Sequence, residues 1–215
     1  FTALAIPVKT SVASKENNMT KVQTKDHEVV SIYPFTEEET EQLMTNAVEA
    51  VLMWSTKDGW PIGVTHAFVW HEGKVWLTFT AQRHRAAAIR RDNRVSVNIS
   101  SASYPEGADP SLPRGAITFK GRGEFFEDRA TKEWLYTALS RKLNRGSPEG
   151  EAAFYSLLDS PLRILLAITP EKRIMYNAGL AERHMAGTVD DTELGERLAS
   201  DTARIDQERK ARALD

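Results

Sequence analysis

Residues 77–100, "LTFTAQRHRAAAIRRDNRVSVNIS", decide the fold of this chain. An alternating, strand-like run stops at Thr80, and three basic or potentially basic side chains follow within three positions, Arg83, His84 and Arg85. The alanine-rich residues 84–92 then predict a short helix, and residues 94–100 alternate again like a strand. The stretch therefore predicts a strand, a helix and a second strand, with positive charge gathered at the first junction.

The composition is that of a soluble globular protein. Of the 215 residues, 41% are hydrophobic and 27% charged, and the net charge of −2 leaves no basic excess. We therefore expect neither a nucleic-acid partner nor a membrane partner. The chain has no cysteine, which excludes a disulfide framework, a thiolate metal site and a cysteine nucleophile, and fits a cytoplasmic location. No apolar stretch approaches the roughly 20 residues that a membrane helix needs.

The chain divides into three parts. We expect residues 1–35 to form a weakly ordered N-terminal extension, 36–185 to form one domain, and 186–215 to form a charged helical tail. The domain opens with a predicted helix over 36–50, because Thr36 and Glu39 have the spacing of a capping box.

The hydrophobic period then changes from 3.6 to 2, which predicts a mainly β (α+β) domain. Three strands joined by short turns form an antiparallel meander, and further strands and helices follow. About six or seven antiparallel strands with peripheral helices indicate a small closed or split barrel. The expected strands are about 51–56, 62–70, 74–80, 94–100 and 115–127, followed by two strands over about 162–177 that are hinged at Pro170. The expected helices after 84–92 are 129–144 and 151–158.

The positive cluster after Thr80 is a candidate phosphate site. The first amides of a helix point outward without partners, and the helix dipole adds partial positive charge there. Arg83 and Arg85 carry forked donors that match phosphate oxygens. Thr78 and Thr80 share a strand face, so a hydroxyl can assist. A solvated basic turn with a helix cap explains the same residues, and the sequence leaves both interpretations open.

The order of these motifs resembles the FMN-binding split-barrel family, which includes pyridoxamine-phosphate-oxidase-like proteins, over about residues 37–180. The family pattern is a strand-end Thr, then Ser/Arg/Lys, a Leu or Ile four residues later, and Asn-Pro-Arg-Val before a strand. Here Arg85 stands for the Lys, Ile89 for the Leu, and Asn93 occupies the common Pro position. "FKGRGEFFED" resembles the family's Gly-x-Ala strand, with Gly123 in place of Ala. The family's Trp-Arg-Leu-x-Pro ending is missing, which argues against pyridoxamine phosphate as the substrate.

The resemblance implies a homodimer with FMN in the groove between the protomers, acting as an oxidoreductase on a small-molecule substrate. Its implied phosphate contacts are Thr80, Arg83, His84 and Arg85. The implied neighbours of the isoalloxazine ring are Thr65, His66, Ala67 and Phe68, whose backbone groups would hydrogen-bond the ring edge. Such donors tune the flavin potential, so no catalytic residue is required.

Three alternatives remain open at this point. The same groove holds a deazaflavin coenzyme in some reductases of the superfamily, and other members bind flavin or haem without turnover. His66 shares a strand face with Val64 and Phe68, so it either approaches the flavin as a proton donor or is a hydrogen-bonded interface histidine. His71 and Glu72 lack the second helical histidine of a zinc peptidase, and we predict no metal site.

Overall fold

The computed structural model describes residues 30–214. The predicted weakly ordered extension, residues 1–35, lies mostly outside these described residues. Within the described part, Phe35 is buried in the main core, and the amide of Asn177 donates to the carbonyl oxygen of Tyr33 at 2.9 Å. The segment just before the first α-helix is therefore packed against the last strand.

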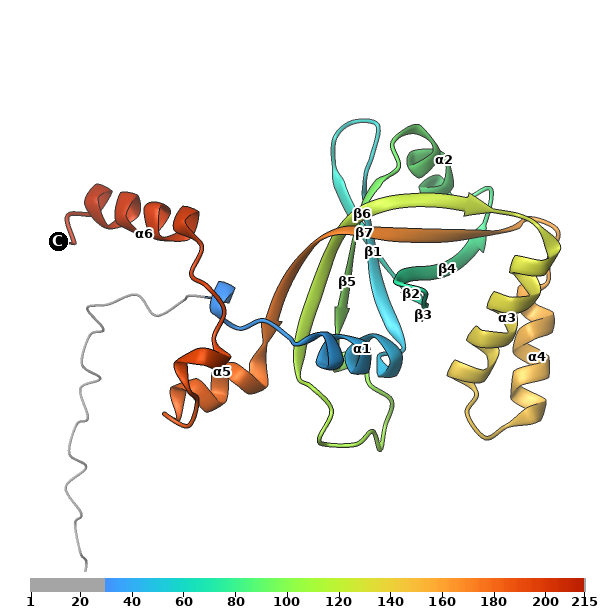
Figure 1. Ribbon diagram of the computed structural model, residues 1–215. Coiled ribbons are helices and arrows are strands. Elements are labelled where there is room, and N and C mark those ends of the chain that lie inside the picture. Colours follow the sequence, from blue (N-terminus) through green and yellow to red (C-terminus); the bar gives the residue numbers. More distant parts are fainter. Residues whose placement is uncertain (1–29, 215) are drawn as a thin grey trace, which may run out of the picture.

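Seven antiparallel strands form one curled sheet in the order β2-β1-β5-β6-β7-β4-β3 (Figure 1). The long strands β6 and β7 cross the whole sheet and pair along most of their length. This architecture confirms the predicted antiparallel split barrel of six to seven strands. The strands are β1 Glu49–Ser55, β2 Pro61–Ala67, β3 Val69–His71, β4 Lys74–Thr80, β5 Arg94–Ser100, β6 Gly115–Phe126 and β7 Arg163–Asn177.

The predicted strand 62–70 is divided at Phe68. Its first part, β2, pairs with β1, and its second part, β3, pairs with β4. The run 62–70 contains no breaker near Phe68, so local sequence gave no signal for this interruption. Since β2 and β3 form the two ends of the sheet order, one short piece of chain joins both sheet edges and forces the sheet to curl.

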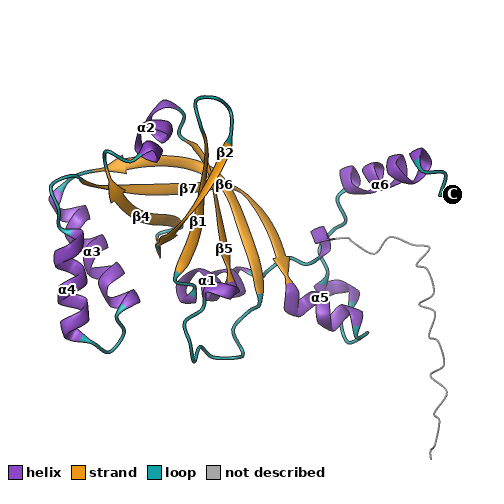
Figure 2. Ribbon diagram, turned by 180° about the vertical axis from the view of Figure 1, so that it is seen from behind, coloured by secondary structure: helices purple, strands orange, loops and turns teal. Residues whose placement is uncertain are grey.

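Helices lie around the curled sheet, and the last helix, Ala199–Ala211, stands away from it (Figure 2). The predicted capping box at Thr36 and Glu39 is present. The fourth helix starts at Pro148, earlier than predicted, because Ser147 accepts from the amide of Gly150 as its N-cap. The α-helices are α1 Glu37–Asn46, α2 His84–Arg91, α3 Arg129–Leu143, α4 Pro148–Leu158, α5 Ala178–Met185 and α6 Ala199–Ala211, and the short 3₁₀ helices are Val30–Ile32, Ser101–Ser103 and Asp191–Glu193.

Two hydrophobic clusters stabilise the domain. The larger one fills the inside of the curl and takes alternate residues of each strand, such as Leu77 and Phe79 of β4. The smaller one lies on the opposite face of β4 and β7, where Trp76 and Leu165 pack against the α3–α4 hairpin. The hairpin is therefore fixed beside the end of β4, next to the positive cluster that the sequence singles out.

Gly121 allows β6 and β7 to approach closely at a register shift. A Cβ atom added at Gly121 would lie 2.3 Å from the backbone oxygen of Thr169, and the pairing shifts between Lys120 and Gly121. A backbone oxygen cannot swing away as a side chain can. A side chain at this position must therefore separate the two longest strands.

We predict that Gly121→Ala lowers the free energy of unfolding by about 1–3 kcal/mol, the range for overpacking a tight interior. Chemical denaturation of the purified variant measures this change. Gly179→Ala is the matched control, because its added Cβ meets no atom closer than 3.4 Å. Equal stability of the two variants would contradict the close approach at Gly121.

Candidate functional site

Strand pairing and a tight turn bring the end of β4, the start of α2 and the start of β7 together. Thr80, the last residue of β4, lies opposite Arg163, the first residue of β7. The amide of Arg83 donates to the carbonyl oxygen of Thr80 at 3.1 Å, which closes the turn. Arg83 is the N-cap of α2, and within this described segment no side chain caps the helix and its first turn has no acidic residue. The amide of Ala86 donates to the carbonyl oxygen of Arg83 at 2.9 Å, and the amides of His84 and Arg85 are left for another acceptor.

Three arginines around this junction have no counterion. Arg83, Arg85 and Arg163 make no side-chain hydrogen bond or ion pair with any residue between 30 and 214. The Nε atoms of Arg85 and Arg163 are buried and have no partner there. Burial, with a smaller contribution from the charge of Arg83, lowers the pKa of Arg85. Burial of a cation without a partner is unfavourable, so the cluster is suited to an anionic ligand.

Arg163 was missed by the sequence analysis. It lies eighty positions beyond Arg83. Burial is the main cause that lowers its pKa, and the charge of Arg83 adds to this effect. Only the register of β4 against β7 brings the two residues together, and an unaligned sequence does not reveal that register.

His66 lies beside the same cluster. Its ring centroid is 5.7 Å from that of Phe79, and the guanidinium carbon of Arg85 lies 5.1 Å from the Phe79 centroid. The Nε2 atom of His66 is buried without a partner in the described part of the chain. Burial, followed by the charge of Arg85, lowers the pKa of His66 to about 4. His66 is therefore neutral near pH 7 and carries a ring nitrogen that is free to bond a ligand.

The predicted ring-side segment runs along an open sheet edge. β2 pairs with β1 on one side, and its other edge has no strand partner among residues 30–214. Thr65 is exposed, and Ala67 is half-buried. Phe68 has no exposed surface, so its side chain belongs to the core and only its backbone can meet a ligand. An open edge of this kind offers backbone donors and acceptors.

The remaining predicted residues differ in whether their side chains are already bonded within the protein and in how exposed they are. The Thr78 hydroxyl donates to the carbonyl oxygen of Ile164 at 2.7 Å, which occupies its proton within the sheet. Thr80 is half-buried and His84 is exposed beside it. The structure thus gathers Thr80, Arg83, His84 and Arg85 at one junction, while Thr78 lies one pleat further along β4. Their contact with a cofactor remains a prediction.

Lys142 is a second residue that the sequence analysis missed. Its Nζ atom lies 4.0 Å from the centroid of the Phe68 ring. Burial, with a smaller effect from the charge of Arg145, lowers its pKa to about 7. A lysine in the last turn of a helix is normally solvated, and this one is drawn in by the way α3 packs on the sheet.

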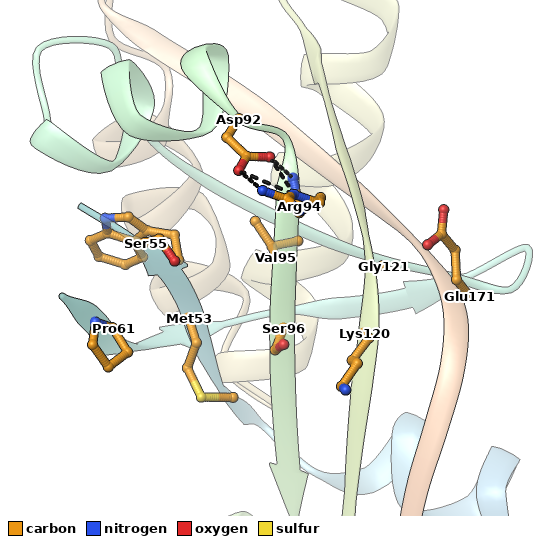
Figure 3. Close-up of a pocket in the computed structure, with 11 residues that line it drawn as sticks. Met53, Ser55, Pro61, Asp92, Arg94, Val95, Ser96, Lys120, Gly121 and Glu171 are labelled. Atoms are coloured by element: carbon orange, nitrogen blue, oxygen red, sulfur yellow. Dashed lines mark hydrogen bonds and ion pairs between the residues drawn. The ribbon is translucent and has the colours of Figure 1, made fainter. Parts of the chain in front are cut away.

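A cavity of about 530 Å³ lies elsewhere, on the β1, β5 and β6 side of the sheet (Figure 3). None of the predicted site residues lines it. Its charged groups are largely paired, since Arg94 contacts Asp92 at 2.6 Å and Glu171 contacts Arg122 at 2.7 Å. We place the candidate site at the unpaired arginines, because paired charges have less to gain from a ligand. The lining residues are Met53, Trp54, Ser55, Pro61, Asp92, Arg94, Val95, Ser96, Lys120, Gly121 and Glu171.

Residues 30–214 contain neither a candidate membrane-spanning helix nor a candidate metal-binding group. No helix there combines the length and the apolar character that crossing a membrane requires. No group of three or more His, Asp or Glu residues in this range is arranged to hold a metal ion.

We predict that an anion at the arginine cluster raises the pKa of His66 from its value of about 4, because Arg85 contributes to that low value. The imidazole signals of His66, followed by NMR from pH 3 to 8 with and without inorganic phosphate, report the change. Arg85→Gln should shift the same titration upward without phosphate. If neither phosphate nor the substitution shifts the titration of His66, the electrostatic effect of Arg85 on His66 is contradicted.

Comparisons with known proteins agree with the observed topology. No family model matches the chain, and no curated protein matches its sequence. The conserved hypothetical protein Rv2991 from Mycobacterium tuberculosis is similar in structure, with a TM-score of 0.56 and 18% identity over 68% of this chain and 87% of that chain. A protein from Bacteroides thetaiotaomicron, proposed to confer resistance to 5-nitroimidazole antibiotics, has a TM-score of 0.51 and 14% identity over 66% and 84% of the two chains.

A proposed pyridoxamine 5'-phosphate oxidase from Listeria innocua is also similar, with a TM-score of 0.47 and 18% identity over 65% of this chain and 96% of that chain. Identities of this order establish the fold alone. The antiparallel strands and the helix that follows β4 match the architecture that the sequence predicts, whereas the break at Phe68 was not predicted. This chain has a seven-stranded antiparallel split-barrel fold, which it shares with these structures.

Proposed function

We propose that this protein binds FMN and acts as an oxidoreductase, with the cofactor between two copies of the chain and a small molecule as substrate. The observation that carries the proposal is the set of unpaired arginines at the start of α2. Arg85 and Arg163 each bury an Nε–H without a partner in the described structure. A phosphate dianion would accept hydrogen bonds from these groups and offset the repulsion among the three cations.

The chemistry of the donors fits a phosphate. Guanidinium groups recognise phosphate oxygens through two parallel N–H bonds, and the uncapped amides of α2 add further donors. Arg83 and Arg85 come from one turn and Arg163 from the neighbouring strand, so the donors approach from different directions. That arrangement is suited to a tetrahedral anion rather than to a planar carboxylate.

The open edge of β2 is suited to the flat ring of the cofactor. Bound flavin supplies the redox chemistry, and the protein has to position it. The backbone of residues 65–68 would bond the ring edge, and neutral His66 would offer one more hydrogen bond through its unpartnered ring nitrogen. Donors near the ring stabilise negative charge on it and so raise its tendency to accept electrons.

A second copy of the chain would complete the site. The β1–β2 hairpin exposes large apolar side chains, with Trp60 67% exposed and Ile62 39% exposed. Exposed apolar groups beside an open strand edge are typical of a surface that another chain covers. Sedimentation velocity with and without FMN tests the dimer, and a monomer at every concentration with FMN bound would contradict it.

A deazaflavin coenzyme is the second candidate, and the number of arginines favours it. Three cations offer more positive charge than one phosphate dianion needs, so a more anionic cofactor tail also fits. Competitive titration of FMN against the deazaflavin, followed by fluorescence quenching, separates the two.

The absorbance spectrum of the purified protein is the first test of the proposed function. Flavin bands support the proposal, and a haem spectrum favours a haem-binding protein. A colourless protein that takes up no FMN contradicts the proposal.

We predict that Arg85→Ala weakens FMN binding by about 1.5–3 kcal/mol, the range for a charge-assisted hydrogen bond. Riboflavin lacks the phosphate, so its affinity should change far less in the same variant. Isothermal titration calorimetry measures both ligands. Arg141→Ala is the control, because Arg141 is an exposed arginine on α3. Equal losses for FMN and riboflavin would mean that Arg85 does not bind the phosphate.

A further inference from the structure

The α3 helix places an amine against the break between β2 and β3. Lys142 lies in the last turn of α3, and its Nζ atom is 4.0 Å from the centroid of the Phe68 ring. Phe68 is the single residue between the two strands and has no exposed surface. Lys142 therefore lies next to the segment that the proposed function assigns to the cofactor ring, but it comes from the helical hairpin.

No acidic group faces this amine in the part of the chain described. Lys142 makes no hydrogen bond or ion pair with residues 30–214, and the charge that acts on it is the like charge of Arg145. Toward the sheet it faces uncharged residues, because Ala67 and Val69 flank Phe68 and pack against the same cluster as α3. Lysine tips normally extend into water, but the Nζ atom of Lys142 itself lies over an aromatic ring.

This environment changes the chemistry of the amine. Burial and Arg145 lower the pKa of Lys142 to about 7, so the ammonium and the neutral amine coexist near neutral pH. A group that exchanges its proton at the working pH is suited to acid–base catalysis. Its Nζ atom is not among the fully enclosed atoms without partners, so the amine keeps some exposed surface.

We propose that Lys142 is a proton donor and acceptor on the substrate side of the cofactor ring. The inference rests on the proposed function. The substrate would be a reducible small molecule that takes up a hydride and a proton together, such as a carbonyl or quinone compound. Bound reduced flavin would supply the hydride, and the ammonium of Lys142 would give up its proton, become a neutral amine and regain a proton from water.

Acetylation of the protein with limiting acetic anhydride tests the amine itself. The nitrogen forms a bond to the acyl carbon, acetate leaves, and the proton passes to the solvent, so only the neutral amine reacts. Peptide mass spectrometry then gives the rate at each lysine as a function of pH. We expect the rate at Lys142 to be half-maximal near pH 7. The exposed residues Lys57, Lys120 and Lys172 are the internal references.

Saturating FMN should slow acetylation of Lys142 at least fivefold and leave those exposed lysines unchanged. A half-maximal pH at Lys142 equal to theirs would overturn the proposal. Absence of protection in protein that demonstrably binds FMN would also overturn it, because the amine would then lie away from the ring. If the protein takes up no flavin, the proposed function fails. The pH dependence of acetylation tests the role of Lys142 independently, because a profile like that of the exposed lysines would reject this role even then.

Two substitutions separate a chemical role from a packing role. Lys142→Met keeps an apolar stem over Phe68 but cannot carry a proton, so kcat at pH 7 should fall about 100-fold, within the range for general acid–base catalysis. The limb of the kcat pH profile near neutral pH should disappear with it. Lys142→Arg keeps the charge and should not restore the rate, since guanidinium does not release its proton. Lys132→Met on the same helix is the control, and an unchanged pH profile in Lys142→Met would overturn the proposal.

Discussion

Phe68 is the single residue that links β2 to β3, the strands at the two edges of the sheet. The geometry of the candidate site depends on this short link. The chain before it pairs with β1 and the chain after it pairs with β4, although these strands lie toward opposite ends of the sheet order. One continuous segment cannot belong to both edges of a flat sheet, so the sheet curls around a buried core. The curl leaves β2 with an open edge and brings α3 over the break, where Lys142 contacts the Phe68 ring.

The arginines of this protein differ in whether a carboxylate lies beside them. Many arginines elsewhere lie against carboxylates, as Arg94 does with Asp92, Arg122 with Glu171 and Arg129 with Asp159. At the start of α2 the cations instead gather where no described carboxylate reaches them. Like charges at close range destabilise the fold unless an anion lies among them. The cluster is therefore a local cost in the free protein that a bound phosphate removes, which links cofactor binding to the stability of the β4–α2 junction.

Most of the fold could be predicted from local sequence, because hydrophobic periodicity and helix capping depend on residues a few positions apart. The predicted strands 74–80 and 94–100 coincide with β4 and β5, and the box at Thr36 is present. The break at Phe68 escaped prediction because the strand pattern continues through it. Arg163 and Lys142 escaped for a different reason. One depends on the register of β4 with β7, and the other on how Leu135 and Leu139 seat α3 on the sheet, and both are tertiary effects.

His66 and Lys142 both lie near Phe68, but the pKa of each is influenced by a different charged residue. Arg85 helps to keep the pKa of His66 at about 4, so this ring stays neutral in the physiological range and can only give or accept hydrogen bonds. The pKa of Lys142, about 7, is set by burial and by Arg145. An anion at the arginine cluster cancels part of the field at His66, whereas no arginine of the cluster is among the causes that set the pKa of Lys142. Phosphate binding and proton exchange can therefore vary independently, so the protein can bind its cofactor at a pH where the amine is free to change charge.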